Sequence, residues 1–223
     1  MLNFRDMVVH HFEKEFSVLN RFIAEIRDVD IQQDPMRFRR NIERIGEVLC
    51  YEMSKTLNYD TKTVQTPFGT KDIALPIDEL VLCSVLRAGN PLHQGLLNYF
   101  DRSENAFISA YRHHPNGGNE FEVIVKYFAA PSLGNKTLVL TDPMLATGRT
   151  LENVLEVLKS HGEPKQIHII SVIGSKEGVE YIKKVFPKGT HLWIAAIDDE
   201  LTRKGYIIPG LGDAGDLAFG PKL

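Results

Sequence analysis

The segment 136–160 constrains the fold more tightly than any other part of the chain. Its apolar run, Leu138 to Leu140, leads into a loop of small and polar residues that extends from Asp142 to Thr150. The loop continues directly into helical spacing, with one apolar face formed by Leu151, Val154, Leu155 and Leu158. This order predicts a buried strand, a tight turn and a helix N-terminus. The first N–H groups of a helix lack intrahelical partners and the helix dipole attracts negative charge, so the segment predicts an anion site.

The loop suits a phosphate group but matches neither common phosphate-binding motif. Gly148 lets the backbone approach a phosphate closely, and the hydroxyls of Thr147 and Thr150 are further donors. No lysine follows the glycine here as in G-x-x-x-x-G-K-[ST], and the loop does not contain G-x-G-x-x-G. It begins instead with an acid, Asp142, at the end of the expected strand.

The chain between residues 79 and 197 repeats this alternation of strand and helix. Apolar runs without a polar face are typical of strands buried on both sides of a parallel sheet. They occur here at Glu79 to Leu86, Ala106 to Tyr111, Leu138 to Leu140, Gln166 to Ile173 and His191 to Ile197. We expect about five parallel strands joined by right-handed crossovers. With 223 residues, 43% of them hydrophobic and 25% charged, the chain suits one globular domain.

Charge and cysteine content argue against several classes of protein. A net charge of −3 gives no reason to expect non-specific binding to nucleic acid or to membranes. The two cysteines, Cys50 and Cys83, lie inside apolar patterns and indicate reduced core residues of a cytoplasmic protein. Neither a signal-like segment nor an apolar run of about 18 residues occurs, so the sequence indicates neither secretion nor a membrane span.

Arginine follows two of the expected strands. Arg87 comes after the run that ends at Leu86, just before the turn residue Gly89, and Arg112 follows Tyr111. Ligands of open α/β sheets bind at the carboxyl ends of the strands, where an unpaired arginine would be costly. We therefore expect these arginines to meet an anionic ligand, with a structural salt bridge as the alternative.

The first 60 residues predict a helical cap. Helical spacing of apolar residues extends from residue 4 to residue 27, and Asp34-Pro35 predicts the start of a second helix that ends near Leu57. The second helix carries four arginines: Arg37, Arg39, Arg40 and Arg44. These arginines form a solvated basic face, a subunit contact or a site for an anionic effector, and the sequence leaves all three open.

Two turn-rich stretches predict hairpins. Pro67 to Thr70 lies between extended segments and predicts a hairpin over residues 61–78. Residues 113–127 contain His113-His114 and two adjacent glycines, and they predict a mobile hairpin or lid. No further ligand has suitable spacing near the two histidines, so we expect no metal site there.

The C-terminal segment 205–216, called the tail loop below, fits no regular element. It contains four glycines, one proline and two aspartates among twelve residues. Interleaved apolar residues argue against disorder, and the acids are too few and too irregularly spaced for a calcium loop. We expect a rigid loop whose backbone N–H and C=O groups bind a small planar ligand.

These motifs together resemble those of the uracil phosphoribosyltransferases over most of the chain. The resemblance is carried by Arg39 to Glu52, Ser84 to Gly95, Tyr111-Arg112, Asp142 to Thr150 (DPMLATGRT) and Gly205 to Gly220 (GYIIPGLGDAGDLAFG). The segment from Asp142 to Thr150, called the phosphate loop below, alone indicates a phosphoribosyltransferase. The tail loop indicates uracil as the base.

The resemblance implies a fold and a reaction. The fold is an α/β, phosphoribosyltransferase-type, twisted and mostly parallel sheet of about five strands flanked by helices, with a hood formed by the N-terminal helices and the C-terminal loop. A single domain, residues 1–223, then comprises a helical cap (1–60), a hairpin (61–78), the α/β core (79–197) and a uracil-binding tail (198–223). The reaction belongs to pyrimidine salvage and transfers the 5-phosphoribosyl group from 5-phosphoribosyl diphosphate to N1 of uracil, giving UMP and diphosphate.

The resemblance also implies roles for individual residues. Asp142, Arg87, Arg112 and Asp213 are the implied catalytic residues. Substrate is bound by these four and by Pro143, Met144, Leu145, Ala146, Thr147, Gly148, Arg149, Thr150, Ile207, Gly212 and Ala214. Mg²⁺ is carried in on the diphosphate donor, with no direct protein ligand assigned. Members form homodimers or larger homo-oligomers, GTP is a candidate effector, and neither nucleic acid nor a membrane is a partner.

The chain departs from the family pattern, and two rival functions remain. Arg149 stands where most members have a second glycine, and residues 113–130 contain more glycine than the usual lid. One rival is a regulatory RNA-binding relative with the same fold, which would need a basic face. The other is a phosphoribosyltransferase for another base, such as a purine or orotate. The carboxylate of orotate would need a cation in the base pocket, and Arg203 or Lys204 could supply it.

Overall fold

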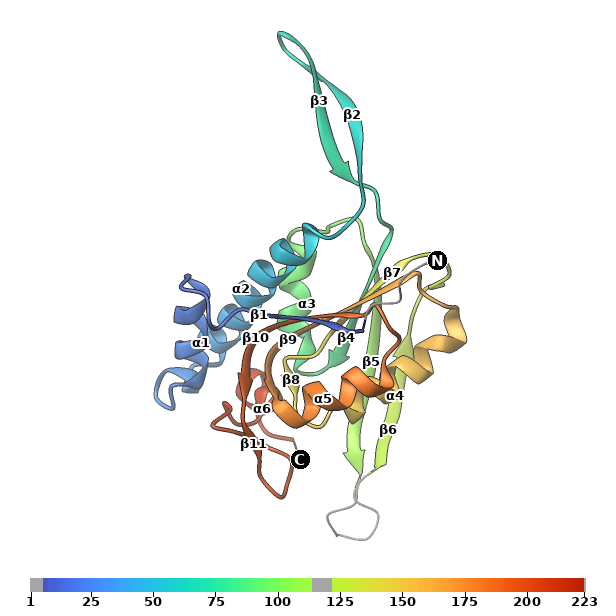
Figure 1. Ribbon diagram of the computed structural model, residues 1–223. Helices are drawn as coiled ribbons and strands as arrows, with labels where there is room; N and C mark the ends of the chain where they lie inside the picture. The colour runs from blue at the N-terminus through green and yellow to red at the C-terminus, as the bar shows by residue number, and fades with distance from the viewer. Residues whose placement is uncertain (1–5, 114–121, 223) are drawn as a thin grey trace.

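The computed structural model describes residues 6–113 and 122–222, with the side chains of all of these except 110–113 and 122–126. A central sheet of eight described strands organises this part of the chain (Figure 1). Seven of the strands lie in the order β1 (Val8–His11), β10 (His191–Asp198), β9 (Gln166–Ser175), β7 (Thr137–Thr141), β4 (Leu80–Leu86), β5 (Glu104–His113) and β6 (Glu122–Ala129). Neighbouring strands along this path are parallel except β5 and β6, and the short strand β8 (Met144–Leu145) pairs with β9.

Helices cover both faces of the sheet, which confirms the α/β class. Side chains along a strand point alternately to opposite faces. Leu138 and Leu140 of β7 pack in one core with α4 (Arg149–Leu158) and α5 (Lys176–Val185). Val139 packs on the other side, with α1 (Leu19–Arg27), α2 (Pro35–Ser54) and α3 (Gly89–Leu97). Every residue of β7 is buried, as expected for a strand covered on both faces.

The N-terminal segment corrects the prediction of one helix over residues 4–27. Residues 8–11 form β1, which extends the sheet by a sixth parallel strand beside β10, and only the second half of the predicted span is helical. The sequence Val8-Val9 favours a strand locally, because β-branched side chains fit a pleated surface well. The strand is fixed by tertiary contact, since the His10 ring stacks on Trp193 with 3.7 Å between ring centroids.

The second helix begins where the sequence predicts. A short 3₁₀ helix, η1 (Ile31–Gln33), comes first, and the carboxylate of Asp34 then accepts hydrogen bonds from the N–H groups of Met36 and Arg37. This cap satisfies two of the donors that the first turn leaves unpaired, and Pro35 needs none. The helix α2 packs closely on α3, because Gly46 and Gly95 face backbone of the other helix at distances that leave no room for a Cβ.

Two hairpins occur where turn-rich stretches predict them. The strands β2 (Tyr59–Thr66) and β3 (Gly69–Pro76) pair along their whole length and project away from the sheet (Figure 1). The second hairpin consists of β5 and β6, which pair antiparallel within the main sheet. Of the predicted lid, residues 113–127, residue 113 belongs to β5 and residues 122–127 belong to β6, and residues 114–121 lie outside the described part of the chain.

The remaining elements lie near the ends of the sheet strands. A 3₁₀ helix, η2 (Lys159–His161), extends α4, and a small antiparallel pair, β11 (Glu200–Leu201) with β12 (Ile207–Ile208), follows β10. The last helix, α6 (Ala214–Phe219), lies at the end of the molecule to which β4 and β5 point (Figure 1). None of the described helices is long and apolar enough to cross a bilayer.

Candidate active site

The phosphate loop lies at the carboxyl end of β7, as the sequence predicts. Asp142 follows β7 and is partly exposed, and its Oδ1 atom accepts a hydrogen bond of 3.3 Å from the N–H of Met144. The carbonyl of Pro143 accepts hydrogen bonds from the N–H groups of Val172 and Ile173, which fix the buried start of the loop to β9. Met144 and Leu145 then form β8, so the first half of the loop is part of the sheet.

The second half of the loop turns sharply into α4. Gly148 is the N-cap residue and has a φ of 78°, a left-handed conformation that glycine adopts without steric cost. Since a glycine has no side chain to cap the helix, the first N–H groups of α4 are left for a ligand, and the dipole of the helix favours an anion there. Thr147 and Thr150 flank the glycine and are partly exposed.

The start of α5 holds the phosphate loop from behind. The buried hydroxyl of Ser175 donates a hydrogen bond of 2.6 Å to the carbonyl of Ala146 and accepts one of 2.8 Å from the N–H of Gly178. A Cβ on Gly178 would lie 2.2 Å from that same carbonyl oxygen, so only glycine allows this approach. The loop conformation therefore depends on a contact with a helix about 30 residues further along the chain.

Arg149 contacts protein groups in this structure. Its guanidinium lies 5.1 Å from the centroid of the Tyr181 ring, and its Nη1 atom donates a hydrogen bond of 3.3 Å to the Tyr181 hydroxyl. That hydroxyl donates to the Glu152 carboxylate at 2.6 Å, and this hydrogen bond raises the pKa of Tyr181. Arg149, the first residue of α4, is thus held against Tyr181 of α5.

Arg87 connects the sheet edge to the C-terminal segment. It follows β4 through a cis Leu86–Arg87 peptide bond. Its Nη2 atom donates to Asp216 Oδ1 at 3.0 Å and to the carbonyl of Gly220 at 3.1 Å, while its buried Nε atom has no hydrogen-bond partner among the described residues. The sequence left open whether Arg87 meets a ligand or a salt bridge, and the structure shows a salt bridge whose two side chains are both 39% exposed. An exposed pair of this kind can exchange partners when an anion arrives.

The tail loop folds back to the same edge of the sheet. Ile207 is buried in β12, and the chain then turns through a cis Ile208–Pro209 bond and two glycines with positive φ, Gly210 and Gly212. Asp213 begins α6, because its Oδ1 atom accepts hydrogen bonds from the N–H groups of Gly215 and Asp216 at 2.8 and 3.0 Å. Its Oδ2 atom lies 3.9 Å from Lys222 Nζ, and Ala214 is buried beneath it.

The structure therefore brings most of the predicted site residues to one edge of the sheet. The phosphate loop ends β7, Arg87 ends β4, and Asp216 of the tail reaches Arg87. Arg112 lies near the end of β5, where it pairs with Val123 of β6, and its side chain lies outside the described residues. The edge combines helix N–H groups, an arginine and carboxylates, so it can bind an anionic, hydroxyl-bearing ligand.

Sequence reasoning missed two residues at this edge. Arg27, the last residue of α1, and Asp198, the last residue of β10, form an ion pair of 2.8 Å that also contacts Gly210 of the tail loop. The one sequence signal for Asp198 was an acid directly after the run that ends at Ile197, the same position relative to its strand as Asp142. Nothing local marked Arg27.

The four arginines of α2 have partners within the chain. Arg37 contacts Glu25, and Arg40 contacts Glu43 at 2.6 Å. Arg44 donates to Asn41, and its guanidinium lies over the Phe22 ring. Arg39 donates to the carbonyl of Ala218 in α6 at 2.6 Å, so this arginine ties the hood helix to the C-terminal segment. All four arginines of α2 thus contact groups of the same chain.

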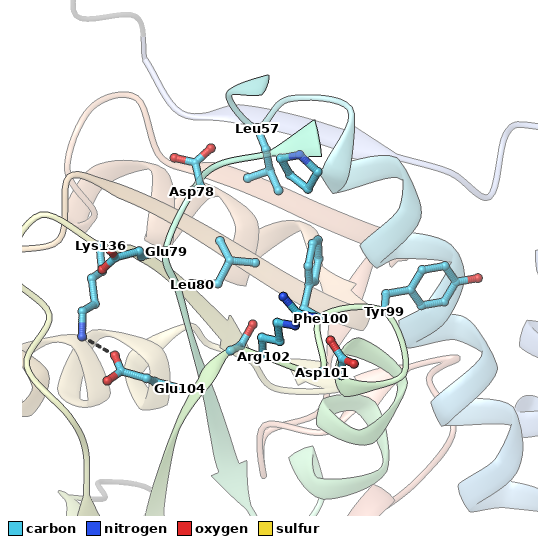
Figure 2. Close-up of a pocket in the computed structure, with 12 residues that line it drawn as sticks. Leu57, Asp78, Glu79, Leu80, Tyr99, Phe100, Asp101, Arg102, Glu104 and Lys136 are labelled. Atoms are coloured by element: carbon cyan, nitrogen blue, oxygen red, sulfur yellow. Dashed lines mark hydrogen bonds and ion pairs between the residues drawn. The ribbon is translucent and has the colours of Figure 1, made fainter. Parts of the chain in front are cut away.

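The cavity shown in Figure 2 lies at the opposite end of the strands. Its volume is about 480 Å³, and it is lined by residues at the starts of β4, β5 and β7 and at the base of the β2–β3 hairpin. Three of its charged residues form ion pairs: Lys136 with Glu104, as the dashed line marks, and Asp78 with Lys165. Because the cavity lies away from the phosphate loop, it is not the candidate site.

The donor set at the phosphate-loop edge suits Mg²⁺ that arrives bound to phosphates. Mg²⁺ is usually bound by one or two carboxylates together with substrate phosphates and waters, rather than by an all-protein cage. The described residues contain no group of three or more His, Cys, Asp or Glu side chains placed to hold a metal ion. Asp142 and Asp213 are both partly exposed carboxylates at this edge, and carboxylate oxygens are ligands that Mg²⁺ accepts.

Comparison with known proteins identifies the family. The model of the uracil phosphoribosyltransferase family matches residues 15–221. The uracil phosphoribosyltransferase of Porphyromonas gingivalis is 52% identical over 97% of this chain and the whole of that protein. That of Pyrococcus furiosus is 37% identical over 95% of this chain and 90% of its own. A solved structure of a protein from Aquifex aeolicus is similar with a TM-score of 0.83 and 30% identity, covering 95% of this chain and 98% of that one. With nearly its whole length matched, the chain belongs to the uracil phosphoribosyltransferase family.

Proposed function

We propose that the chain transfers the 5-phosphoribosyl group of 5-phospho-α-D-ribose 1-diphosphate to N1 of uracil, giving UMP and diphosphate. The bond from C1 of the ribose to the diphosphate oxygen breaks, a bond from C1 to N1 of uracil forms, and the N1 proton is released. The observation that carries this function is the contact between Arg87 and Asp216, because it joins the phosphate-loop edge to the tail loop that characterises the family. The reaction is a pentosyl transfer of pyrimidine salvage.

The phosphate loop forms the sugar-phosphate half of the site. The first N–H groups of α4 and the hydroxyls of Thr147 and Thr150 bind the 5′-phosphate, with Arg149 available for a further contact. Asp142 accepts from the ribose hydroxyls, and its charge offsets the positive charge that develops on the sugar ring. The backbone of Pro143, Met144, Leu145, Ala146 and Gly148 shapes this half of the site, supported by β9 and Ser175.

Arg87 and Arg112 bind the diphosphate. The departing diphosphate gains negative charge in the transition state, and forked guanidinium donors stabilise charge of this kind. Mg²⁺ bound to the donor supplies additional charge stabilisation, and Asp142 and Asp213 are the carboxylates that would hold it. Both contacts of Arg87 to the tail use its Nη2 atom, so its Nε and Nη1 N–H groups are the ones offered to the diphosphate while the pair with Asp216 is intact.

The tail loop forms the base half of the site. Ile207, Gly212, Asp213 and Ala214 present backbone groups and a carboxylate to uracil, and the rigid cap of α6 fixes them. Of the two rival functions, orotate transfer needs a cation in the base pocket, whereas Arg203 and Lys204 are both exposed. The RNA-binding rival needs a free basic face, whereas the arginines of α2 contact protein groups, so we propose no nucleic-acid partner.

The projecting β2–β3 hairpin supports assembly as a homodimer or larger homo-oligomer. A two-stranded hairpin is at best marginally stable alone in water. This one has only two residues that are not exposed, and it carries the exposed apolar side chains of Phe68, Ile73 and Leu75. We propose that a second copy of the chain covers them. GTP remains a candidate effector, and cytoplasmic location remains a prediction that rests on Cys50 and Cys83, which are both buried free thiols.

We propose a single domain, residues 1–223, divided into cap (1–60), hairpin (61–78), core (79–197) and tail (198–223), with the site between core and tail. The test of the function is to incubate the purified protein with donor, Mg²⁺ and uracil and to measure UMP. We expect UMP that depends on all three additions. A protein that binds the donor but forms no UMP would contradict the proposal.

A further inference from the structure

An ion pair contacts the tail loop at Gly210, apart from the contact that Arg87 makes with Asp216. The two Nη atoms of Arg27 each donate to one oxygen of Asp198 at 2.8 Å, and Nη1 also donates to the carbonyl of Gly210 at 3.0 Å. The N–H of Gly210 donates to Asp198 Oδ2 at 2.9 Å. The ion pair thus contacts both the backbone N–H and the backbone C=O of Gly210 in the tail loop. We call Arg27, Asp198 and the Gly210 backbone the clamp.

The clamp is buried to a degree that is unusual for charged groups. The Asp198 side chain is 7% exposed and the Arg27 side chain is 18% exposed. Burying both charges is costly unless their hydrogen bonds are satisfied. Here the fork of Arg27 meets both carboxylate oxygens, and Arg27 Nη1 and Asp198 Oδ2 also meet the backbone of Gly210. Another carboxylate, Glu13, lies 3.9 Å from Arg27 and is more exposed.

Gly210 is required at this position for steric reasons. It has a φ of 59°, and a Cβ built on it would lie 2.2 Å from the carbonyl oxygen of Ile207. The loop therefore has a tight turn between Ile207 and Gly212, with the clamp at its centre. Because a short turn transmits displacement directly along the backbone, movement at Gly210 moves Gly212 and Asp213.

The clamp belongs to the same row of strand ends as the phosphate loop. Asp198 of β10 is the register partner of Ser175 of β9, and Ser175 donates to the carbonyl of Ala146 in the phosphate loop. At the ends of these two neighbouring strands, the Ser175 hydroxyl holds the phosphate loop and the Asp198 carboxylate holds the tail loop. The sheet sets the spacing between these supports.

We infer that Arg27 and Asp198 are positioning residues that hold the tail loop in the geometry that binds the base. Neither residue needs to touch uracil, since both act through the Gly210 backbone. The inference rests on the proposed function, because it assigns the base half of the site to the tail loop. Lysine cannot replace Arg27 here, since one ammonium group does not present the planar fork that contacts both carboxylate oxygens and a carbonyl.

The variants Arg27→Lys and Asp198→Asn test the clamp against two matched controls. Arg21→Lys alters an exposed ion pair of the same helix, and Asp199→Asn alters the exposed neighbour of Asp198, which pairs with Lys176. Steady-state kinetics give KM for uracil, KM for the donor and kcat. We expect KM for uracil to rise about tenfold or more in both clamp variants, the effect of losing a hydrogen bond to a charged group. KM for the donor should rise less than KM for uracil, and both controls should match the wild type.

A merely structural role predicts a different pattern. If the clamp only stabilises the fold, the variants unfold at lower temperature while KM for uracil is unchanged, and this result would overturn the inference. If a clamp variant does not fold, the exchange rate of the Gly210 amide in the wild-type protein tests the clamp instead. We expect this amide to exchange as slowly as the amides of β9, and fast exchange would contradict the inference. Wild-type protein that makes no UMP in this assay contradicts the proposed function, while the exchange measurement still tests the clamp.

Discussion

Replacing Gly178 by alanine tests how tightly the phosphate loop is held. A Cβ at this position would lie 2.2 Å from the carbonyl oxygen of Ala146 and 2.8 Å from that of Leu145. Ordinary van der Waals contact begins at 3.4 Å, so the new methyl group is about 1 Å too close to backbone. Backbone cannot move aside as a flexible side chain can. Either α5 or the phosphate loop must therefore shift by about this distance.

The expected size of the effect follows from that shift. Overpacking of this kind costs about 2 kcal/mol of unfolding free energy, which for a chain of this length lowers Tm by roughly 4–8 °C. A misplacement of about 1 Å at groups that position a substrate can reduce the rate about 100-fold. We therefore expect Gly178→Ala to remain folded at 25 °C while kcat/KM for the donor falls by about two orders of magnitude.

Gly134→Ala provides the control. The nearest atom to a Cβ there is Ser132 Oγ at 3.8 Å, and the position has no positive φ, so the substitution should leave both Tm and kcat/KM nearly unchanged. Circular dichroism shows whether each variant is folded at 25 °C, thermal unfolding gives Tm, and initial rates at varied donor concentration give kcat/KM. A Gly178→Ala protein with the kcat/KM of the wild type would show that the loop does not need its contact with α5, and the reasoning would fail.

Three further predictions concern the tail, the histidines and the hairpin. Asp213→Asn should lower kcat by about 10²–10³ with α6 intact in circular dichroism, since asparagine also caps helices but carries no charge; wild-type turnover would remove Asp213 from the site. Burial lowers the pKa of His168 to about 3 from its ordinary value of 6.5, so the fold favours the neutral ring. The stability that this provides is complete above pH 6.5 and declines as pH falls toward about 3, by up to roughly 1.4 kcal/mol per pH unit. Urea unfolding from pH 7 to 4 should show this dependence of the unfolding free energy on pH. His168→Asn, which can still accept from the Trp193 indole N–H, should reduce the slope; equal slopes in variant and wild type would refute the role of His168. Phe68→Asp at the fully exposed tip of the hairpin should shift sedimentation toward the monomer, and an unchanged sedimentation coefficient would exclude the tip from the contact.

Local signals predicted the core strands and the strand–turn–helix unit of the candidate site, because the residues that form each of them are contiguous in the sequence. The segment 136–160 contains a strand, a turn and a helix start within 25 residues, and the N-cap at Asp34 needs only the residues that follow it. The same reasoning failed at β1, because the apolar spacing around Val8 fits a helix as well as a strand. Its pairing with β10, some 180 residues away, decided the outcome.

Contacts between distant residues account for what the sequence could not predict. Arg27 and Asp198 are 171 residues apart, and each alone is an unremarkable charged residue at the end of an element. The arginines of α2 are a similar case, since their pattern indicated a basic face but could not show that Arg39 contacts Ala218 or that Arg37 contacts Glu25. Pairing of this kind depends on how the elements pack, and no local pattern contains it.

The central claim is that the tail loop selects uracil for the sugar phosphate held by the phosphate loop. The most direct measurement is a competition in which limiting donor and Mg²⁺ are mixed with equal concentrations of uracil, orotate, hypoxanthine and xanthine, and the nucleotides formed are separated and quantified. The account predicts UMP as the dominant product, with loss of diphosphate from the donor in equal amount. Orotidine 5′-monophosphate or a purine nucleotide as the main product, with little UMP, would contradict it.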